Sequence, residues 1–74
     1  MHVDEVQRKI GKEIKKLRCL NEWTQEQMAE RLSMGRNAYG ELERGETDIH
    51  LSRLSQICEV FQIDLVHQTE YLQD

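Results

Sequence analysis

Histidine and cysteine are the residues of this chain most able to hold a metal or act as nucleophiles, and their spacing favours neither role. No CxxC pair or other metal-ligand spacing occurs among them. The sequence also has no glycine-rich phosphate loop and suggests no nucleophile–base pair. We therefore expect no enzymatic activity, no cofactor and no metal. The residues concerned are His2, His50, His67, Cys19 and Cys58.

The stretch with the most organised spacing is residues 24–45, which is typical of two short helices joined by a tight turn. The first helix opens with a capping box, in which Thr24 accepts from the backbone of Gln27 and the Gln27 side chain reaches back. A turn with one glycine follows. The second helix runs over about residues 36–43 and stops before Gly45, a good helix terminator.

Apolar residues recur every three or four positions on both sides of this stretch. Before it, a stripe from Val6 to Leu17 predicts an amphipathic helix of about four turns. Gly11 lies inside that helix and lowers helix stability by roughly 1 kcal/mol relative to alanine. A close contact with another helix would explain why a glycine stands at this position. After it, a stripe from Leu51 to Phe61 predicts another helix. Trp23 is expected to pack in the core as a hydrophobic staple against Met28.

The last segment is predicted to be a helix over about residues 64–72, with a short strand over residues 63–68 as the alternative. It holds more apolar residues than one terminal helix needs, which indicates a surface for a second copy of the chain. The expected dimer residues are Ile63, Val66, Tyr71 and Leu72. Residues 1–74 thus form one all-α domain of five helices, with the helix-turn-helix at about residues 24–44.

Charge is distributed unevenly along the chain. The net charge of −4 argues mildly against nucleic acid as a partner. However, residues 1–39 hold eight basic and six acidic residues, whereas residues 40–74 hold two and eight. No apolar run of about 18 residues and no secretory pattern occurs, so we expect a cytoplasmic protein without membrane contact. In that compartment both cysteines are expected to be reduced, mostly buried thiols.

Around the central stretch the sequence resembles the Cro/C1-type (Xre) helix-turn-helix family. The resemblance covers about residues 10–70 and is most specific in TQEQMAERL (residues 24–32) and ELERG (residues 41–45), which stand at the separation found in the family. It implies a compact, five-helix, lambda-repressor-like DNA-binding domain. In such a domain the second helix lies over the DNA backbone and the third enters the major groove.

The resemblance also implies which side chains meet DNA. Arg36, Asn37 and Glu41 fall where the family reads base edges, and suit guanine, adenine and cytosine respectively. Gln25 falls at the start of the second helix, where a phosphate is expected. Arg18 and Glu43 fall where some members have an ion pair between the first and third helices. The full set of expected phosphate contacts is Thr24, Gln25, Lys15, Arg18 and Arg44.

Six residues depart from the family pattern, one of them Tyr39, which takes a site normally held by Ile or Val and is expected in the core. Gly35 stands where a hydroxyl residue usually caps the third helix, and Gly40 stands where a polar contact residue is common. Glu22 replaces a glycine after the first helix. Glu46 and Asp48 occupy a loop that is rich in Lys and Arg in many members, so they subtract from DNA affinity.

Two functional hypotheses follow. The first is a sequence-specific regulator of transcription, a repressor that binds a palindromic operator in double-stranded DNA as a homodimer. The alternative is an antitoxin or another protein-interaction module of the same fold, with weak or no DNA binding. In that case the partner would be a toxin or another protein. The acidic second half of the chain motivates the alternative.

Overall fold

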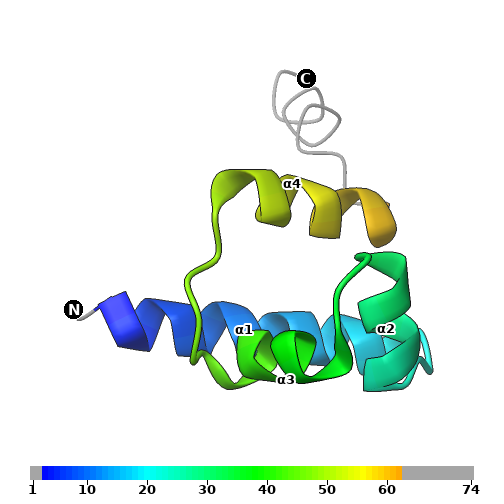
Figure 1. The fold of residues 1–74 in the computed structure, drawn as a ribbon, viewed down its shortest axis with the longest axis horizontal. Helices are drawn as coiled ribbons and strands as arrows, with labels where there is room; N and C mark the ends of the chain where they lie inside the picture. Colours follow the sequence, from blue (N-terminus) through cyan, green and yellow to red (C-terminus); the bar gives the residue numbers. More distant parts are fainter. Residues whose placement is uncertain (1–2, 63–74) are drawn as a thin grey trace, which may run out of the picture.

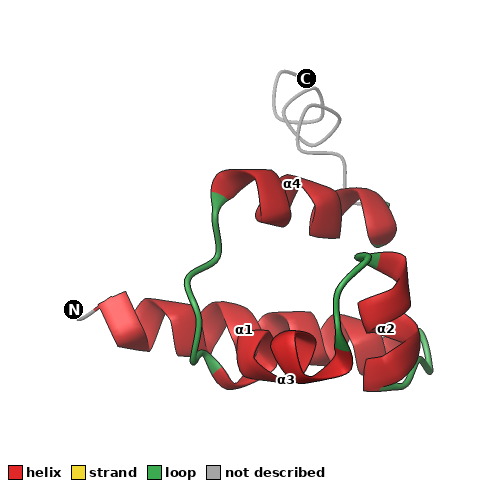
Figure 2. Cartoon of the chain, in the orientation of Figure 1, coloured by secondary structure: helices red, strands yellow, loops and turns green. Residues whose placement is uncertain are grey.

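A computed structural model describes residues 3–62, which form four α-helices and no strand (Figure 1, Figure 2). Helix α3 packs against both α1 and α2, and α4 lies across from α1 and α3 (Figure 1). The all-α helix-turn-helix fold is therefore confirmed. The fifth helix, predicted over residues 64–72, lies outside the described residues. The helices are α1 (Val3–Leu20), α2 (Gln25–Arg31), α3 (Arg36–Arg44) and α4 (Leu51–Val60).

The predicted helix ends around the turn are present. Thr24 Oγ1 accepts from the Gln27 amide at 3.1 Å, and Gln27 Oε1 accepts from the Thr24 amide at 2.9 Å, which completes the capping box of α2. Gly35 caps α3 through its backbone only, as predicted. Gly45 ends α3 at φ 73°, a left-handed conformation that favours glycine.

The turn between α2 and α3 has its left-handed residue at Ser33 and not at its glycine. Ser33 has φ 55°, whereas Gly35 has φ −69° and an extended backbone. The Ser33 amide donates to the Glu30 carbonyl at 3.0 Å and the Met34 amide to the Ala29 carbonyl at 2.8 Å, so Ser33 takes the left-handed position at the end of α2. Glu22 is also left-handed, with φ 59°, which explains why glycine suits that position in related sequences. For a residue other than glycine, this conformation costs roughly 1–2 kcal/mol.

The core lies where α1, α2, α3 and α4 meet. Leu51 was expected in the apolar stripe of α4, but at the first position of that helix it is 82 % exposed. The prediction for the thiols is wrong for Cys19, which is exposed on α1, while Cys58 is half-buried; both are free. The buried apolar residues are Ile14, Met28, Ala29, Leu32, Tyr39, Leu42 and Ile57.

Helix α4 is attached to α2 and to the segment before it by aromatic and polar contacts. Trp23 packs against the core as predicted, and its ring stacks on Phe61 with centroids 5.7 Å apart. The Arg31 guanidinium lies 4.0 Å from the centroid of the Trp23 ring. Arg53 Nη1 donates to the Leu32 carbonyl at 3.0 Å and so satisfies the end of α2. Helix α4 therefore contacts the end of α2, where the turn of the helix-turn-helix begins.

Gly11 allows α1 and α3 to approach closely. A Cβ at this position would lie 2.4 Å from the Glu43 carbonyl oxygen and 2.7 Å from the Leu42 carbonyl oxygen. Both are backbone atoms, so a side chain can be accommodated only if the helices move apart. The close helix contact expected for this glycine is confirmed.

Gly11→Ala is expected to lower the free energy of unfolding by about 1–3 kcal/mol, because overpacking outweighs the gain in helix propensity. Gly40→Ala is the matched control, since its Cβ would meet only the flexible end of the Arg44 side chain, at 3.0 Å. That change should stabilise α3 by about 0.5–1 kcal/mol. Urea unfolding followed by circular dichroism measures both. Equal stabilisation by the two substitutions would contradict the close contact at Gly11.

Candidate nucleic-acid interface

Helix α3 has one buried side and one exposed side. Tyr39 and Leu42 are buried against the core, whereas Arg36, Asn37 and Glu41 are exposed. Asn37 and Glu41 are one helical turn apart and therefore project from the same face. The structure thus places all three predicted base-reading side chains on the solvent side of one short helix.

A buried hydrogen-bond network centred on Glu43 fixes α3 against the other helices. Arg18 of α1 donates through Nε to Oε2 at 2.6 Å and through Nη2 to Oε1 at 3.3 Å. Gln25 of α2 donates through Nε2 to Oε1 at 3.0 Å, and the Tyr39 hydroxyl donates to Oε2. One carboxylate therefore accepts from all three helices, and the predicted ion pair is confirmed.

Burial and hydrogen bonding shift the pKa values within this network. Burial alone would raise the pKa of the Glu43 carboxyl, but the hydrogen bonds from Arg18, Tyr39 and Gln25 outweigh it, so the net pKa is lowered. The hydrogen bond to Glu43 raises the pKa of Arg18. Burial, and then the bond to Glu43, raises the pKa of the Tyr39 hydroxyl. At neutral pH the network is thus a charged pair with a neutral tyrosine.

A helix with one side held rigidly and polar side chains projecting from the other is the arrangement that a helix-turn-helix protein needs. A profile of the Cro/C1 type of helix-turn-helix family matches residues 14–68. The chain belongs to the Cro/C1-type helix-turn-helix family. It is accordingly a DNA-binding regulator of the Xre type, and double-stranded DNA is its partner. A search of curated proteins found no match. Within residues 3–62, no helix has the length and apolar character needed to span a membrane.

Arg18 has a different role in this Cro/C1-type domain from the phosphate contact expected of it. Its side chain is only 10 % exposed, and its third nitrogen, Nη1, donates to the Trp23 carbonyl at 2.7 Å. All three guanidinium nitrogens therefore donate to protein acceptors. We replace the expected phosphate contact with a structural role, because Arg18 joins α1 to α3 and to the segment before α2.

The other residues expected at phosphates lie at the surface. Thr24 and Lys15 are exposed, and Gln25 is half-buried, with its amide nitrogen bonded to Glu43. Arg44 is exposed at the end of α3, where its Nε lies 3.0 Å from Glu46 Oε1. Sequence reasoning treated Glu46 only as a source of repulsion and missed this pair.

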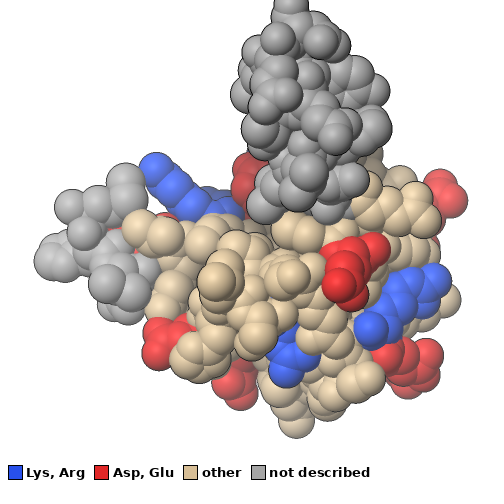
Figure 3. Space-filling view, turned by 90° about the horizontal axis from the view of Figure 1, so that it is seen from above, with Lys and Arg blue, Asp and Glu red and all other residues tan. Residues whose placement is uncertain are grey.

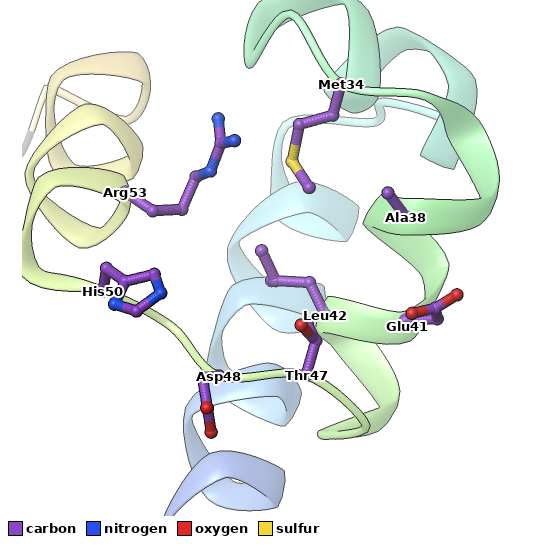
Figure 4. Close-up of a pocket in the computed structure, with 8 residues that line it drawn as sticks. All are labelled: Met34, Ala38, Glu41, Leu42, Thr47, Asp48, His50 and Arg53. Carbon is purple, nitrogen blue, oxygen red and sulfur yellow. The ribbon is translucent and has the colours of Figure 1, made fainter.

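The acidic loop after α3 borders a cleft of about 310 Å³ between α3 and α4 (Figure 4). Leu42 lies at its base, and Asp48 lies on the loop, where it accepts from Gln7 of α1. Among the described residues that are visible in Figure 3, on the side of α4, basic and acidic side chains are scattered and form no continuous basic patch. The lining residues are Met34, Ala38, Glu41, Leu42, Thr47, Asp48, His50 and Arg53.

Proposed function

We propose that this chain is a transcriptional repressor that binds a palindromic operator as a homodimer. The observation that carries the proposal is the exposure of Arg36, Asn37 and Glu41 on a helix whose opposite side is fixed by the Glu43 network. Side chains held on a rigid helix can read base edges in the major groove.

Each exposed side chain of α3 suits one base. Arg36 is proposed to donate bidentately to guanine, Asn37 to bond adenine, and Glu41 to accept from the amino group of cytosine. Thr24, Gln25 and Lys15 are proposed to meet phosphates: the hydroxyl and amide retain donors beyond their internal bonds, and the exposed ammonium is charged.

Dimerisation is part of the proposal because one small domain makes few phosphate contacts. Half-sites about 34–36 Å apart, one turn of DNA, would allow two copies to bind the same face of the duplex. The residues proposed for the interface are outside the described part of the chain. They are Ile63, Val66, Tyr71 and Leu72.

The deciding experiment is selection from random duplex DNA, followed by a salt titration and sedimentation of the free and bound protein. A repressor of this kind enriches a palindrome, binds it with two chains per site, and loses affinity steeply as salt rises. Absence of enrichment at low salt would overturn the proposal.

A second candidate is a protein-binding module such as an antitoxin, and one observation favours it. Two acidic side chains follow α3 in the loop: Glu46 pairs with Arg44 of the last turn of α3, and Asp48 accepts from Gln7 of α1. Acidic residues at such a position disfavour a polyanion. The selection experiment separates the two candidates, since a module without DNA affinity gives no enriched sequence.

Arg36→Ala is expected to weaken operator binding by about 1–3 kcal/mol and to relax sequence preference at one base pair of each half-site. Competition binding with operators altered at each position measures both effects. Lys9→Ala is the matched control, because it removes an exposed cation that lies on α1 and not on the reading helix. If Arg36→Ala weakened all sequences equally, Arg36 would be a phosphate contact and not a base reader.

A further inference from the structure

The exposed side of α3 and the loop after it carry more acidic than basic charge. Arg36 and Arg44 contribute two positive charges, whereas Glu41, Glu46 and Asp48 contribute three negative ones. A surface that approaches DNA normally gains its affinity from a basic excess. The arrangement of these charges therefore bears directly on how strongly the protein binds DNA.

The helix end itself determines the position of Glu46. The Gly45 amide donates to the Leu42 carbonyl at 3.2 Å, and the Glu46 amide donates to the Glu41 carbonyl at 2.9 Å. These two bonds form a Schellman motif, which fixes the backbone of the residue after the glycine. Glu46 is thus held beside the last turn of α3 by backbone geometry, and its carboxylate does not depend on a freely moving loop to reach Arg44.

Arg44 is engaged by this carboxylate. Its Nε lies 3.0 Å from Glu46 Oε1, and both side chains are about half exposed, at 56 % and 53 %. The rest of the guanidinium turns back along α3, since Nη1 lies 3.0 Å from the position that a Cβ on Gly40 would occupy. The last cation of the reading helix is therefore directed toward a carboxylate and along its own helix.

We propose that Glu46 limits DNA affinity by holding Arg44 in an internal ion pair, so that Arg44 contributes little to phosphate binding. This inference rests on the proposed function. To reach a phosphate, Arg44 must exchange one anionic partner for another, and Glu46 is then left unpaired next to the DNA backbone. The result is a domain whose binding depends on base contacts and on a second copy, because sequence-independent attraction is reduced.

A double-mutant cycle in DNA binding tests the proposal. The effect of Arg44→Gln on affinity for the selected operator is measured in the parent and in a Glu46→Gln background. In the parent we expect Arg44→Gln to change the affinity for the operator by less than about twofold, which corresponds to the free energy of a weak surface ion pair. In the Glu46→Gln background we expect a loss of about two- to tenfold, and a salt dependence reduced by about one phosphate contact per chain.

Asp48→Asn supplies the matched background. It removes the same charge from the same loop, but Asp48 is bonded to Gln7 and not to Arg44. We expect Arg44→Gln to remain nearly neutral there. An equal effect of Arg44→Gln in all three backgrounds would overturn the proposal, because Glu46 would then affect DNA binding only through charge repulsion. If the parent binds no duplex even at low salt, the proposed function fails, and this inference fails with it.

Discussion

Glu43→Ala is expected to lower the free energy of unfolding by about 3–5 kcal/mol, a large share of the stability of a domain this small. Glu43 is 6 % exposed, and its carboxylate accepts from Arg18, Gln25 and Tyr39. Its removal leaves the Arg18 charge without its buried partner and leaves two polar groups without an acceptor. The cost is mainly that of the unpaired groups, which is why it exceeds the value of an ordinary hydrogen bond.

Urea unfolding measures this change, with Glu41→Ala as the matched control. Glu41 is the same residue type two positions earlier in α3, but it is exposed, so its replacement should cost less than about 0.5 kcal/mol. Replacing both partners, as in Arg18→Met with Glu43→Met, should cost less than Glu43→Ala, because no buried charge is then unpaired. Equal stability of Glu43→Ala and the parent would show that the network is not formed.

The same carboxylate makes part of the stability sensitive to acid. The folded-state pKa of Glu43 lies below its ordinary value of 4.5, so the stabilisation that its ionised carboxylate contributes is fully present above pH 4.5. It is lost as the pH falls through the lowered folded-state pKa. Stability should therefore decline below about pH 4 in the parent. The double methionine variant should show a smaller decline, since it lacks the group that titrates.

The helices and their ends follow from local sequence signals. The capping box at Thr24 and the stop at Gly45 depend only on neighbouring residues, and the structure has both. Signals of this kind do not reveal which residue bends the chain between α2 and α3. The left-handed residue of that turn is Ser33, which directly follows the C-cap of α2.

Contacts between distant segments were less predictable. Periodicity places Leu51 on the apolar stripe of α4 but cannot show whether another segment covers that end, and Leu51 is 82 % exposed. For Arg18, the same sequence supported both a phosphate contact and an ion pair, and only its burial beside Glu43 separates them. The pair between Arg44 and Glu46 had a usable signal, because a glycine ending a helix commonly positions the next residue beside the last turn.

Leu42→Ala is expected to cost about 2–5 kcal/mol of unfolding free energy, through lost burial and the cavity left behind. Leu42 is 1 % exposed, and its carbonyl lies at the close approach of α3 to Gly11 of α1. It also forms the base of the cleft between α3 and α4 (Figure 4). A smaller side chain here removes contacts that hold the reading helix from its buried side, so operator binding should weaken as well.

Leu20→Ala is the matched control, because the same atoms are removed from a side chain that is 79 % exposed at the end of α1. Its cost should be within about 0.5 kcal/mol of zero. Urea unfolding of the two variants gives the comparison, and operator binding well below the unfolding transition shows whether α3 is displaced. Similar stabilities for the two variants would contradict the burial of Leu42. Loss of stability with unchanged operator affinity would instead mean that the Glu43 network alone is sufficient to orient α3.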